Sequence, residues 1–268
     1  MMRANSSGDL ESQFQREIVS DAFEEAKLLI ESAQGLNVTA RLIGGVAFRT
    51  QLPEWPLRKA PAHDLDFVVR SRDAQGFAHL LEAVGYIPDK KQNALYGHKQ
   101  LYFVDEQNQR PVDVIIDHLE MCHTLELKDR LDVDPLTVAR AELLLSKLQI
   151  VRLNRKDALD VAALLSMYPL GGDEGINVEV FSSLLGGDWG WWRTVTANLD
   201  VVLQLAESND DTFVQEIAMD SPAQFDVAKQ LKGLKRTAEE TPKSRSWKWR
   251  AKLGDRVIWY EEPEEVDH

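Results

Sequence analysis

The sequence lacks the features of membrane-anchored or disulfide-bonded proteins. It has one cysteine, Cys122, in 268 residues, which excludes an internal disulfide framework and a zinc site built from several cysteines. No apolar run approaches the roughly 18–20 residues that cross a bilayer, and the N-terminal segment lacks the apolar core of a signal peptide. We therefore expect a cytoplasmic protein with no membrane partner.

Positive charge is also scarce. The chain carries 31 lysine or arginine residues against 44 acidic residues, a net charge of −13, whereas nonspecific nucleic-acid binders are usually basic. One segment departs from this balance: residues 229–256 hold ten basic and three acidic residues, and the acidic ending EEPEEVDH follows. The global charge therefore does not describe every local surface.

The periodicity of apolar residues predicts an α+β fold. We expect helices at 11–33 and 73–84, the latter ended by a left-handed Gly85. Strands are expected at 38–43, 64–69, 99–104 and 111–116, the last two paired as a hairpin. These elements predict a mixed sheet with flanking helices over residues 1–136, interrupted by a proline-rich loop at 51–62.

The second half of the chain has a mainly helical pattern. A helical domain is expected over 137–240, with helices at 139–151, 154–168, 178–185, 191–206 and 222–236. Residues 241–268 form a basic and aromatic tail, with a small hairpin expected over 247–261. The cleft between the two domains is the expected site.

Two glycines end the first strand of the predicted sheet. Gly44 and Gly45 precede VAFRT, which can start a helix. Without Cβ atoms the backbone approaches a phosphate closely, and amides at a helix start attract it. Arg49, one turn further on, could add a phosphate contact. An ordinary turn and a surface arginine are the plainer interpretations.

Paired aspartates open the next strand. Asp64 and Asp66 fall on one face because side chains alternate along a strand. Acidic residues are depleted in strands, so this pair needs a reason. Divalent cations prefer such oxygen ligands. The alternative is that one aspartate caps a turn and the other faces water.

A third acidic residue, Asp113, lies in the otherwise apolar strand PVDVIID. An isolated buried acid is costly unless it is paired or binds metal. Asp117 shares its face but lies about 13 Å further along at ~3.3 Å per residue, and we expect it to be solvated. Asp64, Asp66 and Asp113 together could hold two Mg²⁺ ions.

Lys147 falls beside the apolar stripe of AELLLSKLQIV. It either extends to water or meets a phosphate as a point charge. Asn154 followed by Asp157 fits helix N-capping. Asp160 lies one turn later on the same face, so both acids could orient Lys147 or Arg155.

Other candidate residues give weaker signals. Cys122 and His123 could suggest a nucleophile pair, but adjacent side chains point apart on a strand or loop. Trp189, Trp191 and Trp192 are expected in the core of the helical domain. The segment PKSRSWKWRAK interleaves aromatic and basic residues, as surfaces that bind single strands do; a packed hairpin with a solvated basic face is the alternative.

Five segments together resemble a bacterial nucleotidyltransferase family of the polymerase-beta-like superfamily. They are RLIGGVAFRT, HDLDFVV, RPVDVIID, LLLSKLQIV and NRKDALDVAAL. That family is related to the abortive-infection and toxin–antitoxin nucleotidyltransferases, and the resemblance covers nearly the whole chain. It implies a nucleotidyltransferase-like sheet domain at 1–136. The proline-rich insert, and Gly45 where many members have serine, depart from the pattern.

The resemblance also implies roles for individual residues. Gly44 and Gly45 would be phosphate-loop residues, and Lys147 would contact the triphosphate. Asp157 or Asp160 would be the supporting acid of the helical domain. The implied metal ligands are three carboxylates: Asp64, Asp66 and Asp113.

The expected activity is Mg²⁺- or Mn²⁺-dependent transfer of a nucleoside monophosphate from an NTP to an acceptor hydroxyl. RNA, a protein and a small molecule are all open as acceptors, and an antitoxin partner is a further expectation. The rival hypothesis is a nucleotide-binding module that keeps this fold without turnover.

Overall fold

The computed structural model describes residues 16–55, 64–208, 211–217 and 223–262, which form two compact units. The sheet unit comprises Met1–Thr50, Ala60–Leu119 and Glu126–Val138. The helical unit comprises Gln51–Lys59, Glu120–Leu125 and Ala139–His268. The sequence was divided into consecutive domains with limits at 136 and 240, whereas each unit here is built from three separate segments of the chain. The tail after residue 240 belongs to the helical unit.

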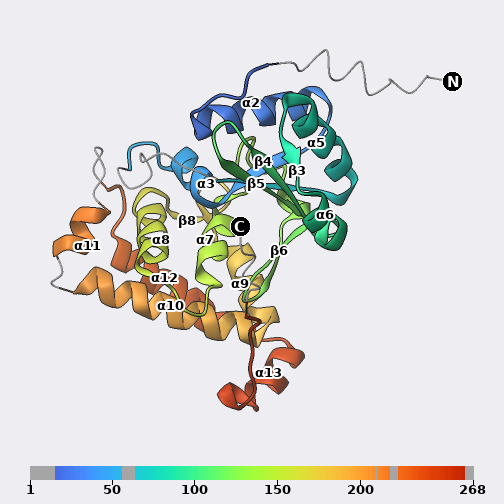
Figure 1. Ribbon diagram of the computed structural model, residues 1–268. Helices are drawn as coiled ribbons and strands as arrows, with labels where there is room; N and C mark the ends of the chain where they lie inside the picture. The colour runs from blue at the N-terminus through green and yellow to red at the C-terminus, as the bar shows by residue number, and fades with distance from the viewer. Residues whose placement is uncertain (1–15, 56–63, 209–210, 218–222, 263–268) are drawn as a thin grey trace. The chain divides into compact units, whose positions relative to one another are not determined.

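A five-stranded mixed sheet organises the sheet unit (Figure 1). Its spatial order is β1-β2-β5-β4-β3, in which β2 and β5 are parallel and the other neighbours antiparallel. The predicted mixed sheet and its hairpin are confirmed. The strands are β1 (Ala40–Ile43), β2 (Leu65–Val69), β3 (Ile87–Pro88), β4 (Gln100–Asp105) and β5 (Arg110–Ile116).

Two amphipathic helices pack on each other and on this sheet. Helix α2 (Ala22–Gly35) begins where the Asp21 carboxylate accepts hydrogen bonds from the amides of residues 23 and 24, so residues 16–21 of the predicted helix 11–33 are not helical. Residues 1–15 lie outside the described ranges. Helix α5 (Ser71–Val84) ends at Gly85 with φ of 113°, as predicted. The short helices α3 (Gly44–Gln51) and α6 (Lys90–Tyr96) complete the unit.

The helical unit contains the five predicted helices with small shifts of their ends. They are α7 (Arg140–Leu148), α8 (Arg155–Met167), α9 (Val178–Gly187), α10 (Trp189–Glu207) and α12 (Val227–Glu240). The sequence did not predict the short helix α11 (Asp211–Glu216). It also did not predict two small two-stranded sheets, which pair β6 (His118–Glu120) with β7 (Thr124–Glu126) and β8 (Leu170–Gly171) with β9 (Ile176–Asn177). No helix in the described ranges is long and apolar enough to cross a membrane.

The tail is helical, so the predicted hairpin over 247–261 is wrong. Helix α13 (Arg245–Ala251) starts at Ser244, whose hydroxyl accepts a hydrogen bond from the Trp247 amide at 3.0 Å. A 3₁₀ turn, η2 (Gly254–Arg256), follows. The N-cap hydrogen bond favours a helix where the aromatic residues alone suggested strands.

Candidate functional site

Asp66 and Asp113 lie side by side in the sheet. Asp66 is on β2 and Asp113 is its direct partner on the parallel strand β5, so their backbones are about 4.8 Å apart. Phe67 packs edge-on against Phe77 of α5, with ring centroids 5.1 Å apart. Because side chains alternate along a strand, both aspartates occupy the sheet face opposite the one that α5 covers. Both are half-buried.

Gly44 brings the start of α3 against the Asp66 carboxylate. β1 pairs with β2 so that Ile43 is opposite Asp66, and Gly44 follows with φ of +68°. A Cβ atom at Gly44 would lie 2.1 Å from Asp66 Oδ2, so the carboxylate occupies the space that glycine leaves open. Gly45 is the second residue of α3. The first amides of a helix have no hydrogen-bond partners within the helix. They can therefore donate to a phosphate, as predicted for Gly44 and Gly45.

Asp64 immediately precedes β2 and is exposed, so the strand begins one residue later than predicted. In the part of the chain that the structure describes, no group of three His, Cys, Asp or Glu side chains is arranged to hold a metal ion. The structure therefore brings together two of the three predicted carboxylates, and a metal-binding role for Asp64 stays a prediction.

Arg49 has structural partners within the sheet unit. Its guanidinium lies 3.3 Å from Asp21 Oδ2 and 4.9 Å from the centroid of the Phe23 ring. These contacts join α3 to the start of α2. The predicted contact between Arg49 and a phosphate would compete with them, and it stays a prediction.

Lys147 belongs to a buried ionic cluster in the helical unit. Its ammonium lies 2.6 Å from Asp157 Oδ1 and 3.3 Å from Asp160 Oδ2. Asp160 is fully buried, whereas Lys147 keeps 17% of its side chain exposed. Asn154 caps α8 by accepting from the Asp157 amide at 2.9 Å, and its own amide donates to Asp157 Oδ2 at 2.7 Å. The predicted capping contact of Asp157 with Asn154 is present, and Asp157 also contacts Lys147. A role of Asp157 and Asp160 in nucleotide binding stays a prediction.

Neutralising Lys147 is expected to destabilise the helical unit. Lys147→Met keeps the apolar stem but leaves two buried carboxylates without this cation. The free energy of unfolding should fall by about 3 kcal/mol, the lower end of the range for a broken buried ion pair, because Lys147 is partly exposed. Urea unfolding measures the change. Lys156→Met, at an exposed position of α8, is the matched control and should change stability by less than about 0.5 kcal/mol. Equal losses in the two variants would contradict this assignment.

The pair Asp66 and Asp113 fits a divalent cation. Mg²⁺ is usually held by one or two protein carboxylates, together with substrate phosphates and water. Two adjacent carboxylates repel each other unless a cation or proton lies between them. The donor set therefore suits a cation that arrives with a nucleotide, without a preformed cage of protein ligands.

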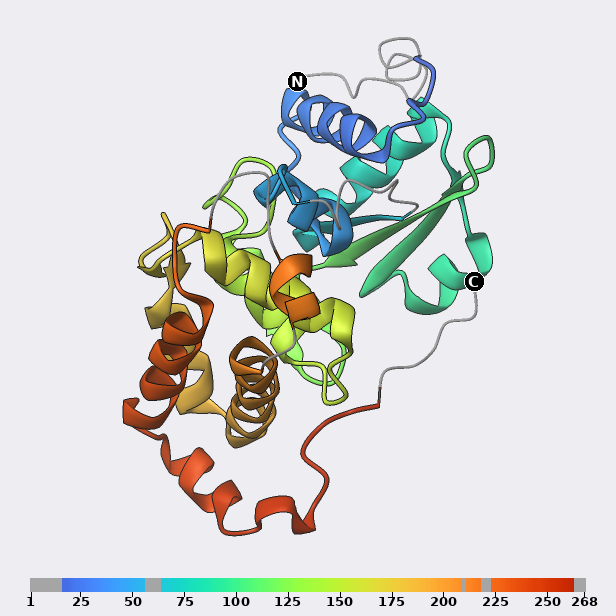
Figure 2. The same cartoon turned by 90° about the vertical axis from the view of Figure 1, so that its left-hand side faces the viewer.

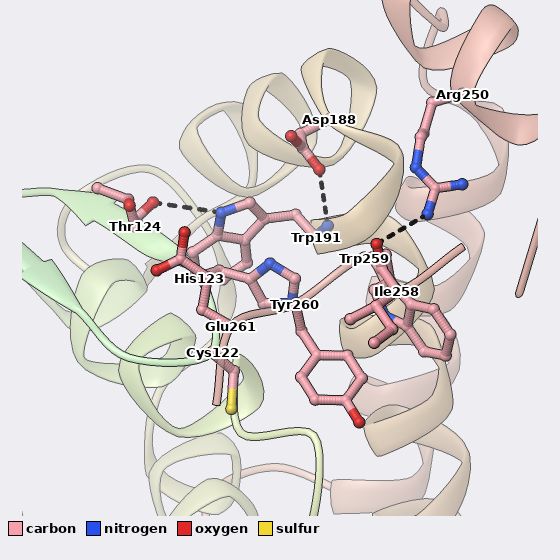
Figure 3. Close-up of a pocket in the computed structure, with 10 residues that line it drawn as sticks. All are labelled: Cys122, His123, Thr124, Asp188, Trp191, Arg250, Ile258, Trp259, Tyr260 and Glu261. Atoms are coloured by element: carbon pink, nitrogen blue, oxygen red, sulfur yellow. Dashed lines mark hydrogen bonds between the residues drawn. The ribbon is translucent and has the colours of Figure 1, made fainter. Parts of the chain in front are cut away.

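A separate pocket of about 470 Å³ lies within the helical unit (Figure 3). The His123 Nε2 atom is 2.8 Å from the Thr194 hydroxyl, and its ring lies 5.0 Å from Trp191. The Cys122 thiol instead accepts from the Val151 amide at 3.5 Å. These partners do not form a Cys–His nucleophile pair. The pocket is lined by Cys122, His123, Thr124, Asp188, Trp191, Arg250, Ile258, Trp259, Tyr260 and Glu261.

Most of this pocket was missed from the sequence, because its residues come from three distant segments. The three tryptophans were predicted to lie in the core of the helical domain. Trp189 and Trp191 are buried there, while Trp192 is half-buried. The Trp191 indole donates to the Thr124 carbonyl, and the Trp259 indole donates to the Thr194 hydroxyl.

The burial of His123 should make the stability of the folded protein decrease at acidic pH. Desolvation lowers the pKa of His123 from 6.5 to about 4. As pH falls below 6.5, the unfolded chain takes up a proton that folded His123 does not, so stability is lost progressively until about pH 4. Denaturant titrations across this range should show a smaller loss in His123→Gln than in the wild type. Parallel pH profiles in the two proteins would contradict this prediction.

Comparison with known proteins gives only distant similarity. No protein-family model matches the sequence, and neither does any curated protein. The crystal structure of an antigenic nucleotidyltransferase-like protein from Paracoccidioides brasiliensis is similar with a TM-score of 0.40 and 12% identity, over 75% of this chain and 94% of that one. The STING-associated CdnE c-di-GMP synthase from Capnocytophaga granulosa gives a TM-score of 0.27 and 13% identity, over 87% of this chain and 80% of that one. Both TM-scores are low, so the functional assignment rests on the residues of the site.

Proposed function

We propose that this chain is a metal-dependent nucleotidyltransferase, which moves a nucleoside monophosphate from an NTP to an acceptor hydroxyl. One observation carries the proposal: Asp66 and Asp113 are partners on parallel strands, and the left-handed Gly44 places the start of α3 against Asp66. Carboxylates for a divalent cation and amides for a phosphate thus meet at one place within the sheet unit.

Each group has a distinct task in this proposal. Asp66 and Asp113 would hold Mg²⁺ or Mn²⁺, which would supply positive charge against the phosphates and the acceptor hydroxyl. Gly44 and Gly45 let the α3 amides approach the phosphates. Asp64, at the entrance to β2, is proposed as an additional ligand once nucleotide is present. No covalent protein nucleophile is required, because positioning and charge neutralisation carry the reaction.

Lys147 is proposed to contact the triphosphate of the NTP, with Asp157 and Asp160 holding its ammonium. The support for this role is that Lys147 is partly exposed although both of its acidic partners are buried. A cytoplasmic location, a toxin-like role and an antitoxin partner belong to the same proposal through the family resemblance.

The test is incubation of the protein with each labelled NTP, Mg²⁺ and total bacterial RNA or protein. The proposal expects release of pyrophosphate and a labelled acceptor with at least one NTP, both abolished by chelation of the cation. Absence of a labelled product, of pyrophosphate release and of NTP binding under all of these conditions would contradict it.

A nucleotide-binding module without turnover is the second candidate. It is favoured by one observation, namely that only two of the three predicted carboxylates come together in the described structure. Calorimetry with NTP and Mg²⁺, run beside a pyrophosphate assay, separates the two functions. Tight binding without pyrophosphate release would support the module and exclude turnover with the acceptors tested.

A further inference from the structure

One face of α13 carries three basic side chains around a tryptophan. They are Arg245, Lys248 and Trp249 together with Lys252, the C-cap residue, which keeps helical backbone angles. Their spacing of i, i+3, i+4 and i+7 places them on one side of the helix. All four are exposed, and Trp249 retains 66% of its accessible surface. We call these four residues the α13 face. In both views α13 lies at the periphery of the helical unit (Figures 1 and 2).

The opposite side of α13 anchors the helix to α10. The Trp247 ring packs edge-on against Trp192, with centroids 5.3 Å apart. The Arg250 guanidinium donates to the carbonyls of Gly254 at 2.9 Å and Val257 at 2.6 Å. Residues two apart on a helix point to nearly opposite sides. Anchoring Trp247 therefore turns Trp249 toward solvent.

The basic side chains of this face make no salt bridge with the acidic side chains of the described residues. Other basic residues of the helical unit have partners, since Lys232 pairs with Glu207 and Arg193 with Asp255. Within the described ranges, none of the three basic residues of the α13 face forms an ion pair. In a chain with a net charge of −13, this face is therefore a local concentration of positive charge, which favours an anionic partner.

We propose that the α13 face binds single-stranded nucleic acid, with a base stacked on Trp249 and phosphates next to Arg245, Lys248 and Lys252. A positively charged surface combined with an exposed aromatic ring is how proteins bind single strands without reading their sequence. Base pairing in a duplex removes the free base faces that Trp249 needs. This inference goes beyond nucleotidyl transfer, because binding requires neither an NTP nor a metal ion.

The helix is less suited to a lipid surface. A helix that lies in a membrane interface buries a continuous apolar face in lipid. The apolar side of α13 is already packed on Trp192, and its outward side holds three basic residues for one aromatic. Exposed Val257 and Ile258 lie beyond the end of the helix, so anionic vesicles are included in the test.

The experiment measures binding of fluorescein-labelled single-stranded RNA, the corresponding duplex, and an abasic strand of equal charge by fluorescence anisotropy. Wild-type protein should prefer the single strand to both of the others. Trp249→Ala should weaken single-strand binding about tenfold, in the range expected for loss of one stacked base, and should leave abasic binding unchanged. A second variant replaces Arg245, Lys248 and Lys252 with glutamine. The slope of the logarithm of the binding constant against the logarithm of the salt concentration should become less negative by about 0.7 for each phosphate that the protein no longer neutralises.

Lys90→Gln combined with Lys91→Gln is the control for loss of surface charge, since it removes two positive charges from exposed positions of α6 in the sheet unit. It should leave single-strand binding unchanged. The proposal is overturned if the wild type does not bind the single strand at low salt. It is also overturned if Trp249→Ala binds like the wild type, if the control variant loses as much affinity as the α13 variants, or if phosphatidylserine vesicles bind while RNA does not.

Discussion

Asp66→Asn is expected to reduce nucleotidyl transfer about a thousandfold while leaving the fold intact. The substitution keeps the size of the side chain but replaces one carboxylate oxygen with an amide NH2 group and removes the charge that would hold a divalent cation beside Asp113. Removing one preorganised electrostatic group from an active site typically lowers kcat by about 10²–10³, and a metal ligand belongs at the upper end. Asp113→Asn should give a loss of similar size, since the two residues are partners on β2 and β5.

Asp89→Asn is the matched control for this prediction. Asp89 caps α6 in the same unit by accepting from the amides of Lys91 and Gln92, and asparagine is an equally good N-cap. This variant should retain full activity. Near-wild-type turnover in Asp66→Asn, or an equal loss in Asp89→Asn, would show that the paired carboxylates do not hold the catalytic cation.

Gly44→Ala is expected to have the largest effect on stability. Residue 44 adopts φ of +68°, and an added Cβ would lie 2.1 Å from Asp66 Oδ2. A left-handed conformation in a residue other than glycine costs about 1–3 kcal/mol, and relieving the close approach adds about 1–3 kcal/mol. We expect a total loss of about 2–6 kcal/mol in the free energy of unfolding, which is the sum of these two costs. The variant should also lose activity even where it remains folded, because the carboxylate must move.

Gly35→Ala separates this effect from a general sensitivity to added methyl groups. A Cβ at Gly35 would meet no heavy atom within 4 Å. Thermal unfolding should show Gly35→Ala within about 0.5 kcal/mol of the wild type. If Gly44→Ala unfolds at the wild-type temperature and stays active, the close approach of α3 to Asp66 is unimportant to the site.

The sequence predicted the strands of the site but not how they pair. Alternation along β2 and β5 indicated which face Asp66 and Asp113 occupy, yet these strands are far apart in the chain. The chain between them passes through α5, β3, α6 and β4 before β5 pairs in parallel with β2. That long-range pairing has no local sequence signal. The pairing that brings the two carboxylates together therefore had to come from the structure.

Helix capping was predicted from the sequence in one case and missed in another. Asp117 was expected to be solvated, but it is half-buried, adopts φ of +63°, and its carboxylate accepts from the Ser71 amide at 2.9 Å. It thus caps the start of α5 from a distant segment. By contrast, the cap of α8 was predictable, because Asn154 and Asp157 lie within one turn of each other. Capping can be predicted from sequence where it is local, and not where the partner comes from another strand.

The most direct test of the central claim is a crystal structure with a non-hydrolysable NTP and Mn²⁺. Anomalous scattering locates the metal independently of the protein coordinates. The account predicts a Mn²⁺ peak in contact with carboxylate oxygens of both Asp66 and Asp113, with the phosphates at the start of α3. Nucleotide and Mn²⁺ bound elsewhere, with these two carboxylates uncoordinated, would contradict it.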